Sequence, residues 1–385
     1  MKILHLAPIK GVRKRDGENR NRTYRPPEGI SVSVPKLAEA QRKSGKKVGV
    51  ISSFASSSED SKIYWDDLSE YKIFSFFSGN KYKKLIKNFG SPDILNIHDI
   101  YNLKQIFFSL HFIIKRVKIF VTPRGAFSEV ALSRSKYKKK LFLYFYKIYA
   151  YFIFSFVALN KNEKDQIKKI FPQKKIIIIG NGVDYSDSRN LHLQTHHDRK
   201  LLEGFINIGF LGRFDIHIKG LDILLKSYLK YQKKEKDLKI KLFLLGEHRV
   251  REFDSKKFIE DIRLELPKPQ MLEVSGPYYG ESKWEELAKL DILIQPSRTE
   301  GMPNTVLEAM SSGIPCAVSP ATNVGDLIIE ANAGWIVDST EEALLAFFIE
   351  VQDMDKKRLM EIGYNAKKYT KENLTWDNIG KLNYL

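Results

Sequence analysis

Residues 292–310 read ILIQPSRTEGMPNTVLEAM, and this stretch indicates the fold. The apolar run at its start predicts a buried strand, and Gly301 and Pro303 mark a loop. The pattern from Val306 to Met310 predicts a helix with Pro303 near its first turn. A strand that leads into a helix is the repeating unit of a doubly wound α/β sheet, in which ligands bind outside the carboxyl ends of the strands. We therefore expect a ligand at this loop.

Two glutamates flank the expected ligand position. Glu300 lies in the loop, and Glu308 lies on the first turn of the predicted helix. Carboxylates accept hydrogen bonds from vicinal hydroxyls, and a helix N-terminus favours anionic groups such as phosphate. A nucleotide sugar carries both kinds of group, so the glutamate pair favours such a ligand. The alternative is a pair of ordinary solvated acids.

A second strand–turn–helix unit lies at residues 206–225, INIGFLGRFDIHIKGLDILL. Its turn carries Arg213 and Lys219, and its helix is expected to begin near Gly220. Arg213 offers a planar fork and Lys219 a point charge, a combination suited to a pyrophosphate that gains charge as it leaves. A further strand at 240–245 ends at Gly246, where a backbone can approach a ligand. The alternative for both cations is surface solvation.

These segments and several others resemble one enzyme family. The matching segments are GFLGR at 209–213 with KG at 219–220, LLGE at 244–247, GPY at 276–278, LDILIQPS at 290–297, the glutamate pair, GIP at 313–315 and NGVD at 181–184. The chain resembles the retaining nucleotide-sugar glycosyltransferases of the GT-B class, a large family that includes bacterial mannosyl-, glucosyl- and galactosyltransferases. The resemblance covers nearly the whole chain. It implies an α/β fold with two Rossmann-like doubly wound domains facing a central cleft.

The resemblance also implies a role for each residue of the donor site. It places Arg213 and Lys219 on the diphosphate, Glu300 on the transferred sugar and Glu308 on the ribose hydroxyls. Arg213, Lys219 and Glu300 are the predicted catalytic residues. The predicted donor-binding residues are Gly212, Gly246, Glu247, Gly301, Met302, Pro303, Asn304, Thr305 and Glu308.

No metal and no cofactor are expected, since the nucleotide sugar is itself a substrate. No Asp-x-Asp motif ends a predicted strand, and the closest match, residues 252–254, falls in a charged loop. We expect side chains and helix N-termini to neutralise the leaving diphosphate, a role that a divalent metal fills elsewhere. No side chain is assigned as a nucleophile. A front-face mechanism, in which the donor phosphate takes the acceptor proton, fits best.

Acceptor-binding candidates lie in the first half of the chain. His98 ends a predicted strand, although a lone histidine there is commonly structural. Arg124 lies in a Pro-Arg-Gly segment that resembles a variant found among bacterial surface-polysaccharide transferases. Gly29 precedes a predicted helix where relatives usually carry two glycines, and Glu28 occupies the other position here. The loop at 10–30 has seven basic residues, which either recognise the pyrophosphate of a lipid-linked acceptor or remain solvated.

The length of 385 residues predicts more than one domain. We expect an acceptor-binding domain at 1–184, completed by a C-terminal helix at 370–385, then a linker at 185–203 and a donor-binding domain at 204–369. The single cysteine, Cys316, fits a reducing compartment and lies in an apolar run that favours buried packing. The apolar run at residues 3–8 is too short for a secretory signal.

The net charge of +18 is unevenly distributed along the chain. Residues 1–200 carry 39 Lys and Arg against 17 Asp and Glu, whereas residues 201–385 carry 25 against 29. A cationic half attracts anionic membranes, polyphosphate-linked lipids and nucleic acids. The alternative is a lysine-biased proteome.

Residues 136–154, KYKKKLFLYFYKIYAYFIF, are both aromatic and lysine-rich. Lys147 interrupts the apolar run and a buried strand follows, so we expect a helix and a strand rather than a membrane span. Such a helix suits a peripheral membrane contact, with aromatic side chains at headgroup level and lysines on anionic lipid. The alternative is a core-packed helix with a lysine-rich end.

The resemblance implies a retaining hexosyltransferase that moves a hexose or N-acetylhexosamine, with a UDP-sugar favoured as donor. The expected acceptor is a sugar hydroxyl of a lipid-linked oligosaccharide in bacterial surface-polysaccharide synthesis, either O-antigen of lipopolysaccharide or capsule. We expect a cytoplasmic enzyme, peripheral on the inner face of an anionic cytoplasmic membrane, with no nucleic-acid partner. The alternatives are a GDP-mannose-type donor, a sugar phosphorylase or epimerase of the same fold, and a non-enzymatic polyanion-binding protein.

Overall fold

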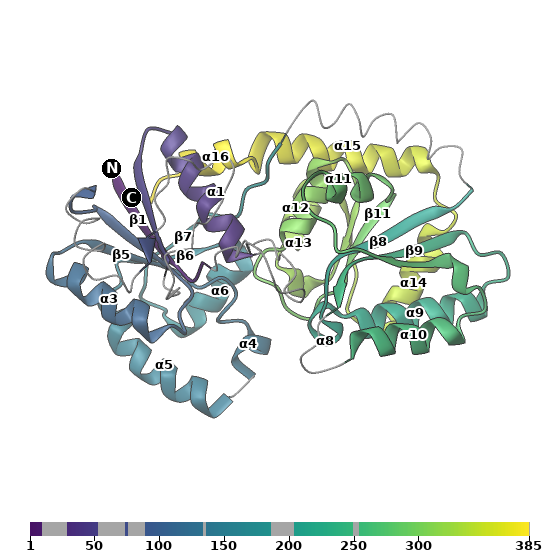
Figure 1. Cartoon of the computed structure of the whole chain (residues 1–385), viewed down its shortest axis with the longest axis horizontal. Helices are drawn as coiled ribbons and strands as arrows, with labels where there is room; N and C mark the ends of the chain where they lie inside the picture. Colours follow the sequence, from purple (N-terminus) through teal and green to yellow (C-terminus); the bar gives the residue numbers. More distant parts are fainter. Residues whose placement is uncertain are drawn as a thin grey trace, which may run out of the picture. The chain divides into compact units, whose positions relative to one another are not determined.

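The computed structural model describes residues 1–9, 29–52, 74–75, 89–133, 136–185, 204–248 and 254–384 (Figure 1). Most of the predicted basic loop, residues 10–28, and most of the predicted linker, residues 186–203, lie outside these ranges. The chain divides into two compact units. The first comprises Met1–Gly182 and Trp376–Leu385, and the second comprises Val183–Thr375.

The first unit contains a parallel sheet of seven strands in the order β3-β2-β1-β4-β5-β6-β7. Its strands are β1 (Lys2–Ala7), β2 (Lys47–Ser52), β3 (Phe74–Ser75), β4 (Ile94–His98), β5 (Lys118–Thr122), β6 (Ser155–Ala158) and β7 (Ile176–Ile178). Its helices are α1 (Ile30–Lys43), α3 (Leu103–Ile114), α4 (Glu129–Ser133), α5 (Lys136–Ala150), α6 (Lys161–Ile170) and α16 (Trp376–Lys381).

Helices pack on both faces of this sheet, as expected for strands that are apolar almost throughout. Leu4 and Leu6 of β1 belong to a core shared with α3, α5 and α6. Ile3 points to the other face and packs with residues of α1 and α16. Figure 1 shows α1 and α16 close together on that side.

The second unit contains a parallel sheet of six strands in the order β10-β9-β8-β11-β12-β13. Its strands are β8 (Ile206–Phe214), β9 (Ile240–His248), β10 (Leu272–Ser275), β11 (Ile292–Gln295), β12 (Cys316–Val318) and β13 (Gly334–Ile336). Its α-helices are α8 (Ile216–Lys219), α9 (Leu221–Lys234), α10 (Ser255–Glu265), α11 (Gly280–Ala288), α12 (Asn304–Ser311), α13 (Gly325–Glu330), α14 (Glu341–Val351) and α15 (Lys356–Asn373).

The two sheets share one topology, and it fixes where ligands can bind. In each unit the chain starts at a central strand, moves outward over two strands, and returns to the other side of the starting strand. The returns place β1 beside β4 and β8 beside β11, which are the switch points of two Rossmann-like sheets. The predicted α/β fold with two doubly wound sheets is confirmed.

Several local predictions are also resolved. Residues 136–154 form α5 and the turn before β6, as predicted, and no helix in the described ranges is long and apolar enough to span a membrane. Cys316 is fully buried in β12, as predicted, and burial raises the pKa of its thiol.

The predicted single helix at 370–385 is wrong. Helix α15 ends at Asn373, and α16 starts at Trp376. Helix α16 packs closely within the first unit: a Cβ on Gly182 would overlap the Trp376 side chain, and a Cβ on Gly380 would overlap the backbone of Ala40 in α1.

Candidate functional site

The carboxyl ends of β8 and β9 are held together by glycines. Gly212 pairs in register with Gly246, and a Cβ on Gly246 would overlap the carbonyl oxygen of Gly212. Gly276, just after β10, also lies close to Gly246, because a Cβ on Gly276 would come within 2.8 Å of the Gly246 backbone nitrogen, and its φ is 106°. Only glycine fits such close backbone contacts. At these three positions the strand ends therefore present backbone rather than side chains.

The turn after β8 is locked against the end of β11. Asp215 caps α8 by accepting a hydrogen bond from the backbone N–H of Ile218 at 3.2 Å. Gly220 has a φ of 69° and ends α8, and a Cβ there would overlap the carbonyl oxygen of Pro296. Since α9 begins at Leu221, the helix start predicted near Gly220 is confirmed. The turn fixes the backbone of Lys219 beside the loop after β11.

Lys219 and Glu300 form an ion pair across this junction. Lys219 Nζ donates to Glu300 Oε1, and Ser297 Oγ donates to the same oxygen at 3.2 Å. Both charged side chains are 17% exposed, so they remain reachable from solvent. The backbone of Glu300 is fixed as well, because its N–H donates to the carbonyl of Ala321 and its carbonyl accepts from Asn323 Nδ2 at 2.6 Å.

Glu308 lies elsewhere on the helix than predicted. Pro303 has an extended backbone and is the N-cap of α12, so the helix starts at Asn304 and Glu308 falls on its second turn. Its carboxylate pairs with Lys283 Nζ of α11 at 2.6 Å. Nothing in the sequence indicated Lys283, because a lysine 25 positions away on another helix carries no local pattern.

The remaining predicted donor residues lie on the same edge of the second unit. Arg213 is the penultimate residue of β8 rather than part of the predicted turn after it; it is in register with Glu247 of β9, and both are half-buried. Met302 and Pro303 are buried, whereas the flanking Gly301, Asn304 and Thr305 are partly exposed. Helix α12 has no side-chain cap at its N-terminus. Within the described ranges no three His, Cys, Asp or Glu side chains group in a way that could hold a metal ion.

The acceptor-side candidates of the first unit lie close together. Arg124 Nε donates to His98 Nδ1 at 3.2 Å, and Arg124 Nη1 donates to Ser33 Oγ at 3.0 Å. Ser33 lies in the first turns of α1, whose N-cap is Gly29 with a φ of 56°. Arg124 is partly exposed, whereas His98 is fully buried. No sequence pattern indicated that His98 also contacts His5, 93 positions away.

Burial sets the protonation of this cluster. Desolvation lowers the pKa of His5 to about 4 and holds that of His98 well below its usual value, with the Arg124 charge acting in the same direction on both. The pKa of Arg124 is lowered to about 10, mainly by burial. At neutral pH the cluster therefore contains two neutral imidazoles and one guanidinium cation.

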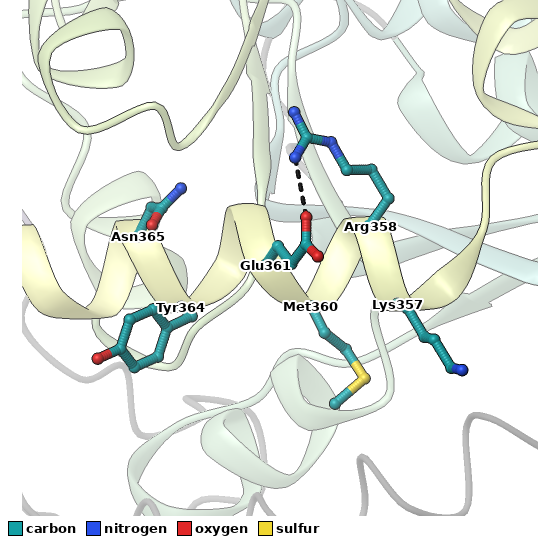
Figure 2. Close-up of a pocket in the computed structure, with 6 residues that line it drawn as sticks. All are labelled: Lys357, Arg358, Met360, Glu361, Tyr364 and Asn365. Carbon is teal, nitrogen blue, oxygen red and sulfur yellow. Dashed lines mark hydrogen bonds and ion pairs between the residues drawn. The ribbon is translucent and has the colours of Figure 1, made fainter.

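A depression of about 580 Å³ lies on the surface of α15 in the second unit. Figure 2 shows that all six side chains lining it come from this one helix, with Arg358 and Glu361 joined by an ion pair of 2.8 Å. Met360 and Tyr364 are exposed there. A ligand site needs polar groups converging from several elements, so we assign no function to this depression.

Comparisons with known proteins cover both units. Residues 27–187 match the family described as Glycosyltransferase Family 4, and residues 193–369 match Glycosyl transferases group 1. The chain is 24% identical over 239 residues to "Uncharacterized glycosyltransferase MJ1607" of Methanocaldococcus jannaschii, covering 58% of this chain and 57% of that protein. It is 25% identical over 326 residues to "Capsular polysaccharide biosynthesis glycosyltransferase CapM" of Staphylococcus aureus, covering 80% and 77%.

Solved structures share the fold. HepE of Anabaena, crystallised in complex with UDP, superposes with a TM-score of 0.69 at 16% sequence identity. The superposition covers 99% of this chain and 98% of that one.

Proposed function

The chain belongs to the glycosyltransferases of the GT-B type, and we propose that it moves a hexose or N-acetylhexosamine from a nucleotide sugar to a sugar hydroxyl with retention of configuration. The Lys219–Glu300 pair carries this proposal. It lies at the β8/β11 switch point, where a Rossmann-like sheet binds nucleotides. A lysine and a glutamate side by side there offer one contact for phosphate and one for sugar hydroxyls.

Each donor contact is assigned from charge and position. Arg213 and Lys219 hold the diphosphate, Glu300 and the backbone after Gly301 hold the transferred sugar, and Glu308 holds the ribose hydroxyls. The diphosphate competes with Glu300 for the ammonium of Lys219, which frees the Glu300 carboxylate for hydroxyls. UDP is favoured as the nucleotide, since HepE of the same fold was solved with UDP.

The reaction is proposed to take place on one face of the sugar. The bond between the anomeric carbon and the diphosphate oxygen breaks while the acceptor hydroxyl approaches from the same side. The acceptor proton passes to the departing phosphate oxygen, so no base from the protein is required. Negative charge builds up on the diphosphate, and Arg213 and Lys219 stabilise it without a divalent metal.

A thermal-shift screen of UDP-, GDP- and ADP-sugars tests this proposal, because a ligand that binds only the native state raises the melting temperature. We expect the largest shift with a UDP-sugar. A larger shift with GDP-mannose would favour the alternative donor. A shift with sugar phosphates but with no nucleotide would favour a phosphorylase, and no shift with any of them would favour a polyanion-binding protein.

Replacing Glu308 with alanine is expected to weaken UDP binding by roughly 1–3 kcal/mol, the range for hydrogen bonds to a charged group. Isothermal titration with UDP measures the loss. Lys283→Ala is the matched control, because it removes the ion-pair partner and leaves the carboxylate in place. If Lys283→Ala weakened UDP binding as much as Glu308→Ala, the ion pair rather than a hydroxyl contact would explain the effect.

The acceptor is proposed to be a lipid-linked oligosaccharide of surface-polysaccharide synthesis, O-antigen or capsule. The similarity to CapM, which is named for capsular polysaccharide biosynthesis, supports this class. The cationic composition of residues 1–200 agrees with an acceptor that carries pyrophosphate and lies at an anionic membrane. It supports the proposal of a peripheral enzyme on the inner face of the cytoplasmic membrane.

Two neighbouring helices of the first unit offer the membrane contact. On α3 the exposed side chains Leu103, Phe107, Leu110 and Ile114 form one helical stripe. On α5 the exposed side chains include Leu141, Tyr144, Phe145 and Ile148. The helices touch through the hydroxyls of Ser109 and Tyr149, 2.6 Å apart, and lie side by side in Figure 1. An apolar and aromatic face of this kind, rimmed by lysines, suits the headgroup level of a bilayer.

Removing lysines from α5 is expected to weaken binding to anionic vesicles. Lys138, Lys140 and Lys147 are exposed, and their combined replacement by glutamine should cost up to about 1 kcal/mol per charge in a vesicle sedimentation assay. Higher salt should reduce binding of the unmodified protein, because the Debye length falls from about 10 Å at 0.1 M to about 3 Å at 1 M.

Lys139 is the matched control within the same helix. It donates to the carbonyl of Ala131 and lies over the Tyr101 ring at 4.9 Å, so it is held against its own unit. Lys139→Gln should therefore lose less vesicle binding than Lys138→Gln or Lys140→Gln. Equal sedimentation with neutral and anionic vesicles, or none with either, would contradict the proposed membrane contact.

A further inference from the structure

A chain of buried polar side chains crosses the first unit and ends at Arg124. At its far end the Tyr384 hydroxyl accepts from Asn96 Nδ2 at 2.9 Å and from Gln41 Nε2 at 3.3 Å. His5 Nε2 lies 2.8 Å from Gln41 Oε1. All four of these side chains are fully buried. These hydrogen bonds therefore link β1, β4, α1 and the C-terminal segment in one network.

The hydrogen-bond directions in this chain follow from Arg124. Its Nε can only donate, so His98 Nδ1 accepts and the His98 proton is on Nε2. That proton points to His5 Nδ1 at 2.9 Å, which places the His5 proton on Nε2, facing Gln41 Oε1. Every ring nitrogen is used once. An additional proton on either ring would place two N–H donors opposite each other with no acceptor between them. Both rings therefore stay neutral while these hydrogen bonds are intact.

Arg124 is held in place by neutral partners. Besides His98, its Nη1 donates to Ser33 Oγ at 3.0 Å and to Asn181 Oδ1 at 3.2 Å. The backbone of Arg124 has a left-handed φ of 56°, which is unusual for a side chain of this size. A segment kept in such a conformation by three side-chain contacts presents its guanidinium in one orientation.

No carboxylate within the described ranges pairs with Arg124. Glu163, whose charge raises the pKa of Arg124, is fully buried, and its Oε1 accepts from the backbone N–H of Gly125 at 2.5 Å and its Oε2 from that of Leu159 at 2.7 Å. Arg124 Nη2 has no hydrogen-bond partner among the described residues. A partly exposed guanidinium whose hydrogen-bond partners are all neutral can still form a charge-assisted hydrogen bond with an anion through Nη2.

We propose that Arg124 binds a phosphate group of the acceptor through Nη2, and that the His98–His5–Gln41–Tyr384 chain positions it for this contact. The proposal rests on the proposed function and names a feature of its acceptor: a diphosphate next to the sugar chain. His98 is then a positioning residue. Being fully buried with both nitrogens engaged, it acts on the acceptor only through Arg124.

Diphosphate binding to the full-length protein tests the proposal. The enzyme is first saturated with UDP, which fills the donor site, and is then titrated with farnesyl diphosphate, inorganic pyrophosphate and farnesol. We expect both diphosphates to bind and farnesol not to bind. Binding of farnesyl diphosphate and farnesol, but not of pyrophosphate, to the unmodified protein would show that lipid rather than phosphate is recognised, and would overturn the proposal.

Two arginines in left-handed backbone make a matched pair of variants. Arg124→Gln is expected to raise the Kd for both diphosphates about tenfold or more, which corresponds to about 1.4 kcal/mol. Arg116→Gln is the control, since Arg116 has a φ of 58° and is exposed in the same unit. Equal Kd values for Arg124→Gln and the unmodified protein would overturn the proposal. Failure of the unmodified protein to bind UDP would instead contradict the proposed function.

Two replacements of His98 distinguish a role in positioning Arg124 from a purely structural role. In His98→Asn the amide oxygen can take the place of Nδ1 and accept from Arg124, whereas in His98→Gln the amide reaches the position of Nε2 and the Arg124 contact is lost. We expect His98→Asn to keep most of the diphosphate affinity and His98→Gln to lose it. If both variants lowered the melting temperature and left the Kd unchanged, the chain would be structural and the positioning role would be wrong.

Discussion

Replacing Lys219 with alanine is expected to lower turnover by about 10²–10³, the scale for deleting one preorganised group that stabilises charge in a transition state. The ammonium is held at the β8/β11 switch point by the locked turn at Gly220, so no reorganisation is needed when the diphosphate departs. UDP binding should weaken far less than turnover, because the largest charge develops only as the bond breaks. Steady-state kinetics with the best donor from the thermal-shift screen measure turnover, and isothermal titration with UDP measures binding.

Lys226→Ala is the matched control for this prediction. Lys226 lies on α9, one to two turns after Lys219, is half-exposed and pairs with Glu341 at 3.9 Å. It should keep the turnover of the unmodified protein. Glu300→Ala should also lower turnover with the fold intact, since the Glu300 backbone is fixed by Ala321 and Asn323 rather than by its carboxylate.

A chelator tests whether the proposed mechanism needs a divalent metal ion. If Arg213 and Lys219 neutralise the diphosphate, adding a chelator should leave turnover unchanged. Loss of activity on chelation, restored by magnesium or manganese, would contradict the metal-independent mechanism. Full activity of Lys219→Ala would show that the ion pair with Glu300 is a structural contact.

The fold could be predicted because its signals are local. Apolar runs such as 240–245 and 292–294 give buried strands, and Gly246 at the end of the first run leaves room for close backbone contact. Lys219 and Glu300 lie 81 positions apart, yet both follow strands of the same parallel sheet. Parallel strands end at one edge, so strand order alone brings the two residues together.

The partners of these residues could not be predicted in the same way. The Glu308–Lys283 pair and the His5–Gln41–Tyr384 chain join positions on helices, strands and the C-terminal segment. Such contacts depend on how helices cover a sheet, which no short pattern encodes. The prediction that His98 lies at a ligand site was made from its strand end, whereas its complete burial depends on α1 and the residues after α16.

Acid is expected to destabilise the first unit through its buried histidines. The pKa of His5 falls from 6.5 to about 4 on folding, and that of His98 falls as well. Between these pKa values the unfolded protein binds more protons than the folded one. The histidine contribution to the free energy of unfolding is therefore fully present above about pH 6.5 and is lost as the pH falls toward 4. For His5 alone the loss is roughly 2 kcal/mol at pH 5 and roughly 3 kcal/mol below pH 4.

Other titratable groups near the His5 and His98 rings determine how the histidine contribution to stability can be measured separately. Arg124 and Tyr384 keep their charge states throughout this pH range, because burial lowers the pKa of Arg124 only to about 10 and raises that of Tyr384 to about 12. Burial raises the pKa of the carboxyls of Glu163 and Asp99, and their protonation stabilises the fold as the pH falls. The histidine effect must therefore be measured as a difference between proteins rather than from one pH profile.

Hydrogen exchange at pH 7.5 and pH 5, corrected for the intrinsic rate at each pH, makes that measurement. Peptides from β1 and β4 should lose protection at pH 5, and peptides from β8 and β11 serve as the internal reference. In His5→Gln one titrating ring is absent, so the difference between the two pH values should shrink even if the variant is less stable at both. An unchanged difference in His5→Gln would mean that His5 does not titrate on unfolding. The hydrogen-bond directions derived from Arg124 would then be wrong, because they require a neutral His5 that gains its proton only when the chain from Arg124 to Tyr384 is broken.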